Sequence, residues 1–91
     1  MVTRRLFVRG HVQGVGYRYA MVDAANARGV AGWVRNRRDG SVEALVQAES
    51  EVIDSIVAWC RRGPAGARVS DVEVVEASEE TIAGFELRPS V

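Results

Sequence analysis

"VAGWVRNRRDGSVEALVQAE", residues 30–49, contains two strand-like runs on either side of an Asp-Gly pair. Both runs, "VAGWVRN" and "SVEALVQAE", are rich in valine and other apolar residues. The Asp39-Gly40 pair between them is one of the strongest short-range signals for a β-hairpin. We therefore expect two antiparallel strands joined by a tight turn at residues 37–40.

A helical pattern lies on each side of this hairpin. Apolar residues recur at helical spacing in residues 17–28, "YRYAMVDAANAR", and again in the segment "SEVIDSIVAWCRRG" that follows the hairpin. These positions are Tyr17, Met21, Ala24 and Ala25 in the first helix, and Val52, Ile53, Ile56, Val57 and Cys60 in the second. Gly29 and Gly63 are placed to end the two helices, and Ser50 is placed to cap the start of the second.

Strand-like segments lie outside the two helices. In "RLFVRGHV", residues 5–12, apolar Leu6 and Val8 alternate with Arg5, Phe7 and Arg9, which is the two-residue period of a strand. "RVSDVEVVEA", residues 68–77, alternates similarly, and "GFELRPS", residues 84–90, gives a short last strand that a proline ends.

The predicted order is therefore βαββαβ with a short trailing strand. Right-handed crossovers place both helices on the same face of the sheet. We expect an α+β, two-layer ferredoxin-like sandwich with an antiparallel sheet. Because no linker divides the sequence, we expect a single domain over residues 1–91.

Composition excludes several classes of function. The 12 basic and 12 acidic residues balance, the pI is near 6.6, and no tail carries a run of one charge. We therefore expect no nucleic-acid partner. No apolar run approaches the ~18 residues of a membrane span, so we expect no membrane partner and a cytoplasmic location. One cysteine and one histidine predict neither an internal disulfide nor a structural metal site.

Several phosphate and cofactor motifs are absent. All basic residues are arginine, so the lysine of a nucleoside-triphosphate loop is missing, as are lysine nucleophiles and Schiff bases. A dinucleotide fingerprint would need glycine where Tyr19 stands. A cysteine phosphatase loop counted from Cys60 would need arginine where Gly66 stands, and Cys60 fits the apolar face of its helix. We expect no cofactor.

The stretch "GHVQGVGYR", residues 10–18, lies between the first strand and the first helix. Its glycines, Gly10, Gly14 and Gly16, allow positive φ angles that turn successive N–H groups toward one point, and the new helix adds its own unpaired amides. Such a nest binds an anion. Arg18 lies on the first helical turn, where its guanidinium can supply the full positive charge that amides lack.

Asn36 ends the first strand of the hairpin. In a split βαβ fold this strand runs parallel to the first strand of the chain with one strand between them, so Asn36 and the glycine loop emerge at the same edge. Two strand spacings separate them by about 9 to 10 Å. An arginine, a phosphoryl group and one water can span such a gap.

Both motifs resemble those of the acylphosphatase family. "VRGHVQGVGYR" is similar to the family's glycine-rich loop with its closing arginine, and "GWVRNRRDGSVE" is similar to its asparagine-bearing hairpin. The resemblance extends over essentially the whole chain. Tyr17 stands where phenylalanine is commoner, so its hydroxyl needs a partner, and His11 lies at a position that varies widely.

The resemblance implies a metal-free hydrolase that cleaves acyl phosphates to a carboxylate and inorganic phosphate. Arg18 would bind the phosphoryl group and Asn36 would position the attacking water. The backbone amides that would hold the phosphoryl oxygens are those of Gly10, His11, Val12, Gln13, Gly14 and Val15. The expected ligands are a small acyl phosphate and inorganic phosphate, which is both product and competitive ligand, and we expect a monomer.

Two other classes of function remain open from the sequence. One is a non-catalytic anion-binding module, either a regulatory ferredoxin-like domain or a phosphate-holding part of a larger carbamoyl-transfer enzyme. Asn36 argues against it, because a pure binder does not need a residue directed at water. The other is an RNA-binding sheet of the same topology, which is disfavoured because aromatic residues do not cluster on the central strands.

Overall fold

The hairpin expected between the two helices forms the middle of the sheet. The computed structural model describes residues 1–91, in which β2 (Ala31–Asn36) pairs antiparallel with β3 (Val42–Ala48). The Arg37 N–H closes the turn by donating to the Ser41 carbonyl at 2.9 Å, and Gly40 has a φ of 92°. The Ser41 hydroxyl and amide both donate to the Asp39 carboxylate, and these bonds lower the pKa of Asp39.

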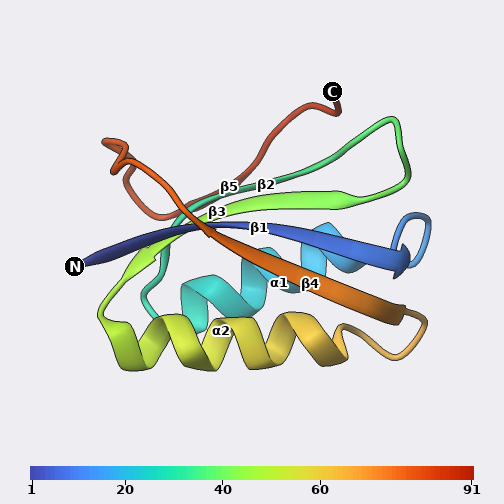
Figure 1. Cartoon of the computed structure of the whole chain (residues 1–91), viewed down its shortest axis with the longest axis horizontal. Coiled ribbons are helices and arrows are strands. Elements are labelled where there is room, and N and C mark those ends of the chain that lie inside the picture. The colour runs from blue at the N-terminus through green and yellow to red at the C-terminus, as the bar shows by residue number, and fades with distance from the viewer.

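Five strands and two helices form two layers (Figure 1). The remaining elements are β1 (Val2–His11), α1 (Tyr17–Ala27), α2 (Ser50–Arg62), β4 (Arg68–Glu76) and β5 (Phe85–Leu87). The strand order is β4-β1-β3-β2-β5, and both helices cover the same face of the sheet (Figure 1). The predicted ferredoxin-like sandwich is confirmed.

The last strand makes the sheet mixed, whereas the sequence predicted an antiparallel sheet. β4 lies at one edge and β5 at the other, so the chain must cross the end of the sheet between them. This crossing brings the chain to the edge of β2 at the end where β2 begins, and β5 therefore runs parallel to β2. The other strand pairs are antiparallel.

The apolar core lies between the sheet and the helices. β3 is the central strand, and all of its residues are buried. On β1, Leu6 and Val8 are fully buried, and they pair with Ala44 and Val42 of β3. The predicted alternation of β1 is therefore confirmed. Burial of one face also fixes the register of the strand, because a shift by one residue would turn its apolar side chains to the opposite face.

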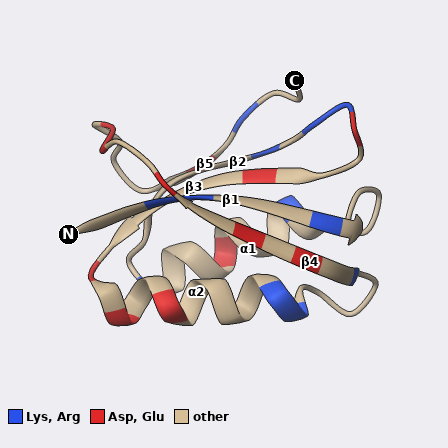
Figure 2. Ribbon diagram, viewed as in Figure 1, with Lys and Arg blue, Asp and Glu red and all other residues tan.

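The opposite face of the sheet is closed by arginine side chains. Glu43 is only 2% exposed and accepts hydrogen bonds from Arg5 and Arg35, at 3.2 and 2.8 Å. The Arg35 guanidinium also lies 4.6 Å from the centre of the Trp33 ring. Figure 2 shows basic segments on β1 beside acidic segments on β4, where Arg9 bonds to two carboxylates. The Trp33 ring on this face is therefore covered.

The helix ends agree with the predictions except at the start of α2. Gly29 has a φ of 70°, and a Schellman arrangement ends α1, with the Val30 N–H donating to the Ala25 carbonyl at 2.9 Å. The prediction that Ser50 caps α2 is wrong by one residue. The cap is Glu49, whose carbonyl accepts the first helical bonds, and Ser50 already belongs to the helix.

Tyr17 joins the start of α1 to the end of α2. Its hydroxyl donates to the Cys60 carbonyl at 2.8 Å, in the last turn of α2, where carbonyls lack helical partners. The Tyr17→Phe change removes this bond, so we expect it to lower the free energy of unfolding by about 1 kcal/mol. Thermal and urea denaturation would measure the loss. Tyr19→Phe, at an exposed tyrosine, is the matched control, and equal stability of the two variants would contradict the assignment.

Candidate active site

The two sequence motifs meet at one end of the sheet. β1 and β2 both pair antiparallel with β3, so they run parallel to each other and finish at the same end. Val8 and Asn36 both pair with Val42 of β3, which places Asn36 level with the last core residue of β1. The prediction that Asn36 and the glycine loop share this end is confirmed.

A hollow of about 210 Å³ lies between the loop, α1 and β2. Its lining consists of Val12, Gln13, Gly14, Gly16, Tyr17, Arg18, Tyr19 and Asn36. None of these side chains is acidic, and one is a guanidinium. The lining therefore favours an anionic ligand over a cation.

The loop presents backbone donors to this hollow. Gly14 and Gly16 have φ angles of 75° and 77°, so the predicted positive φ is confirmed. The N–H groups of residues 12–16 donate to no other main-chain group. The first bond of α1 runs from the Ala20 N–H to the Gly16 carbonyl at 3.1 Å, which leaves the N–H groups of residues 17–19 without helical partners. Gly16 is the N-cap and has no side chain that could satisfy them.

The structure divides the predicted amide donors into two groups. Val12, Gln13 and Gly14 line the hollow, whereas Gly10, His11 and Val15 do not. Gly10 and His11 still belong to β1 and pair with Val69 and Arg68 across a bulge. A Cβ on Gly10 would lie 2.2 Å from the Arg68 carbonyl oxygen, so close strand approach explains this glycine. Gly16, Tyr17 and Tyr19 also line the hollow, although they were not predicted to contact a ligand. Their position at the start of α1 was the feature of the sequence that could have indicated it.

Arg18 differs from Arg35 of the neighbouring hairpin. Arg35 is held by Glu43 at 2.8 Å. Arg18 forms no ion pair and no hydrogen bond with another side chain or carbonyl. Its guanidinium lies 5.9 Å from the centre of the exposed Tyr19 ring, at the hollow. The full charge of Arg18 is therefore available to a ligand.

Asn36 brings a carboxamide to the same hollow. Its side-chain oxygen Oδ1 is buried and has no hydrogen-bond partner in the protein. The backbone of the residue is fixed on both sides, because it pairs with Val42 and its carbonyl accepts a bond from the Val91 N–H at 3.0 Å. Buried polar atoms without partners are rare and costly. Because Asn36 lines the hollow, rotation of its carboxamide would bring this oxygen to a ligand or a water there.

No activated nucleophile lines the hollow. Cys60 is fully buried on α2, and burial raises the pKa of its thiol to about 12. Burial, together with the Cys60 contact, raises the pKa of Tyr17 as well, and the Tyr17 hydroxyl already donates to a carbonyl. The prediction that Cys60 is a core residue is confirmed. The arrangement suits attack by water rather than by a side chain.

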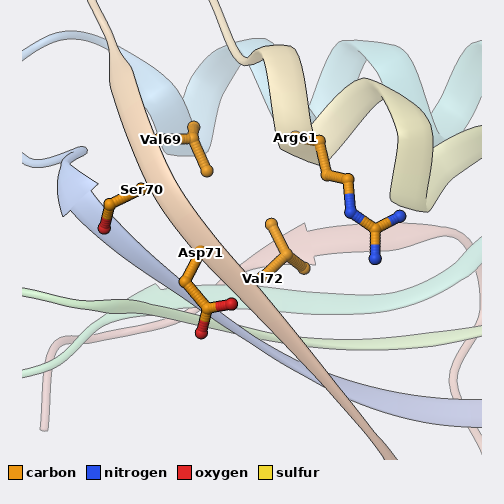
Figure 3. Close-up of a pocket in the computed structure, with 5 residues that line it drawn as sticks. All are labelled: Arg61, Val69, Ser70, Asp71 and Val72. Carbon is orange, nitrogen blue, oxygen red and sulfur yellow. The ribbon is translucent and has the colours of Figure 1, made fainter.

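Another hollow, of about 250 Å³, lies at the outer edge of β4 (Figure 3). Arg61 of α2 and Asp71 of β4 are among the residues that line it (Figure 3). Asp71 is paired with Arg9 at 3.2 Å, and the glycine loop does not reach this edge. Although it is larger, this hollow has a carboxylate in its lining and contains no buried side-chain atom without a partner.

No cluster of three or more histidine, cysteine, aspartate or glutamate side chains is placed to hold a metal ion. Neither helix combines the length and the apolar character needed to cross a membrane.

Comparisons with known proteins agree with the geometry. The acylphosphatase family model matches residues 4–87. An acylphosphatase of Albidiferax ferrireducens is 54% identical over 89 residues, which cover 98% of this chain and 96% of that protein. The crystal structure of the Bacillus subtilis acylphosphatase superimposes with a TM-score of 0.93 at 38% identity, covering 97% of this chain and 99% of that one. An acylphosphatase from Coxiella burnetii gives a TM-score of 0.91 at 32% identity, over 96% of this chain and 92% of that one. The resemblance carried by the glycine loop and the hairpin is therefore confirmed, and the chain belongs to the acylphosphatase family.

Proposed function

We propose that this protein hydrolyses the carboxyl–phosphate bond of acyl phosphates in the hollow between the glycine loop and Asn36. The observation that carries the proposal is the buried, unpartnered Oδ1 of Asn36 beside a group of free donors. A site that only binds an anion needs donors alone. A carboxamide beside those donors offers an acceptor for a second ligand that donates, and water next to a bound phosphoryl group fits this requirement.

The phosphoryl group occupies the donor side of the hollow. The free N–H groups of Val12, Gln13, Gly14 and Gly16 and of the first turn of α1 surround its oxygens, and Arg18 adds a full positive charge. Phosphoryl transfer passes through a loose transition state in which charge spreads over these oxygens. Donors that are already in place stabilise that charge without reorganising during the reaction.

Water attacks from the side of Asn36. Oδ1 accepts one hydrogen of the water and holds its oxygen toward phosphorus. A bond then forms between the water oxygen and phosphorus, and the bond to the carboxyl oxygen breaks, with its electron pair leaving on the carboxylate. The leaving carboxylate is a weak base, so no general acid is required. Because no side chain of the hollow is a base, a phosphoryl oxygen of the substrate takes the proton that the water loses.

The test is a hydrolysis assay in the presence of a metal chelator. Acetyl phosphate or benzoyl phosphate is the substrate, and p-nitrophenyl phosphate, a phosphate monoester, is the control. We expect turnover of the acyl phosphates and at least a hundredfold slower turnover of the monoester, since its leaving group is a stronger base and the site provides no acid. Comparable rates for the two classes, or binding of phosphate without any turnover, would contradict the proposal.

A further inference from the structure

The side chain of Gln13 links the glycine loop to the hairpin that carries Asn36. Its amide nitrogen Nε2 donates to the Arg37 carbonyl at 2.7 Å and to the Ser41 carbonyl at 2.9 Å. Both N–H hydrogens of the carboxamide are therefore used. These carbonyls lie 24 and 28 residues further along the chain.

The two acceptors are the carbonyls that close the hairpin turn. The Ser41 carbonyl also accepts the Arg37 N–H at 2.9 Å, and the Arg37 carbonyl also accepts the Gly40 N–H at 3.1 Å. The Gln13 amide thus uses the second acceptor position of each carbonyl. The turn itself is held by the bonds from Ser41 to Asp39, so Gln13 binds a preformed surface.

No other hydrogen bond connects these two parts of the site. The backbone bonds outside helices and strands include none between residues 12–16 and residues 37–41, and no other side chain of the loop bonds to the turn. β3 separates β1 from β2, so the sheet alone holds the two motifs two strands apart. The loop leaves the sheet after His11, and beyond that point Gln13 is its hydrogen-bonded tie to the hairpin.

We propose that Gln13 is a positioning residue, which sets the distance between the donors that hold the phosphoryl group and the water held by Asn36. This inference rests on the function proposed above. Asn36 directly precedes Arg37, whose carbonyl Gln13 holds, so a shift of the loop relative to the turn changes the gap across which the water must attack. Reactions of this kind lose rate steeply when the reacting groups are misplaced by about 1 Å.

The test is a double-mutant cycle between Gln13 and Asn36. Gln13→Met keeps the length and apolar stem of the side chain and removes both donors. We expect kcat to fall about tenfold, while KM and the inhibition constant of inorganic phosphate stay within about twofold. These two constants should persist because the loop N–H groups that bind phosphate belong to the backbone, which the variant keeps. In the Asn36→Ala background we expect the same change at Gln13 to lower kcat less than twofold, because there is no longer a positioned water to misplace.

The matched control is Gln47→Met. Gln47 also bonds a distant backbone group, because its amide nitrogen donates to the Glu80 carbonyl at 2.9 Å, but it is buried and lies at the other end of β3. We expect the Gln47→Met change to lower the midpoint of thermal unfolding without changing kcat. If Gln13→Met does not fold, as judged by circular dichroism, Gln13→Asn takes its place in the cycle, because its shorter side chain cannot reach both carbonyls.

Each outcome of the cycle has one meaning. An unchanged kcat in the Gln13 variant, a parallel loss of phosphate affinity, or an equal tenfold loss in the Asn36→Ala background would overturn the positioning role and leave the proposed function intact. Full activity of Asn36→Ala alone would instead refute the role of Asn36 in the proposed function, whatever the Gln13 variants show.

Discussion

Arg18→Ala is expected to lower kcat/KM for an acyl phosphate by a hundredfold or more. Arg18 is the one charged side chain that lines the hollow, and no carboxylate of the protein competes for it. The change removes a full positive charge from the place where transition-state charge accumulates. Loss of one preorganised donor at such a position typically costs a factor of 10² to 10³.

Phosphate binding should weaken in the same variant. Arg18 is assigned to the phosphoryl oxygens, which inorganic phosphate also has, so the inhibition constant of phosphate should rise together with the loss of turnover. Arg18→Lys should recover only part of the rate, because a lysine ammonium keeps the charge without the planar fork. Steady-state kinetics with phosphate as the competitive inhibitor measures both effects.

Arg62→Ala is the matched control for Arg18. Arg62 is an exposed arginine in the last turn of α2 that does not line the hollow, and its removal should leave kinetics unchanged. Wild-type kinetics in the Arg18→Ala variant would remove Arg18 from the site. A loss of rate with unchanged phosphate inhibition would instead indicate that Arg18 acts on the attacking water and not on the phosphoryl group.

Local patterns were sufficient to predict most of the fold. The Asp39-Gly40 turn, the apolar spacing of the two helices and the alternation around Leu6 each report on structure within a few residues, and all three are confirmed. Gly29 at the end of α1 belongs to the same class, because a positive φ is a local demand. The topology then followed from the order of elements and from crossover handedness.

Features that depend on distant partners could not be predicted in this way. Gly10 looked like part of the loop, but it is a glycine because β4 passes close to it, and nothing near it in the sequence reports that strand. The parallel pairing of β5 depends on the chain crossing the end of the sheet. The Gln13 link to the hairpin depends on how far the loop projects beyond β1, which only the assembled sheet determines.

The site itself was predictable where chemistry and topology agreed. Arg18 and Asn36 were placed together because parallel strands finish at one end of the sheet, and the hollow contains both. What the sequence could not indicate is that the Asn36 oxygen is buried without a partner. That observation, together with the place of Asn36 in the lining of the hollow, separates it from a residue that merely ends a strand.

Asn36→Ala is expected to reduce kcat for acyl phosphates by at least about a hundredfold while leaving phosphate inhibition within about twofold of wild type. The variant removes the acceptor that holds the water, but it leaves the loop amides and Arg18 in place. Positioning of a reactant contributes a large share of enzymatic rate enhancement, so its loss should appear in kcat. Because phosphate does not use this acceptor, its affinity should persist.

Asn26→Ala separates this effect from general destabilisation. Asn26 is the other asparagine of the chain, and its side-chain oxygen accepts the Phe85 N–H at 3.2 Å, so its removal weakens the attachment of β5. We expect lower thermal stability and normal turnover from Asn26→Ala. For Asn36→Ala we expect the reverse, since removing a buried acceptor that has no partner relieves a cost of desolvation and should leave stability equal or slightly higher. If Asn36→Ala loses turnover and phosphate affinity together, Asn36 acts on the anion and not on the water, and the division of roles across the hollow is wrong.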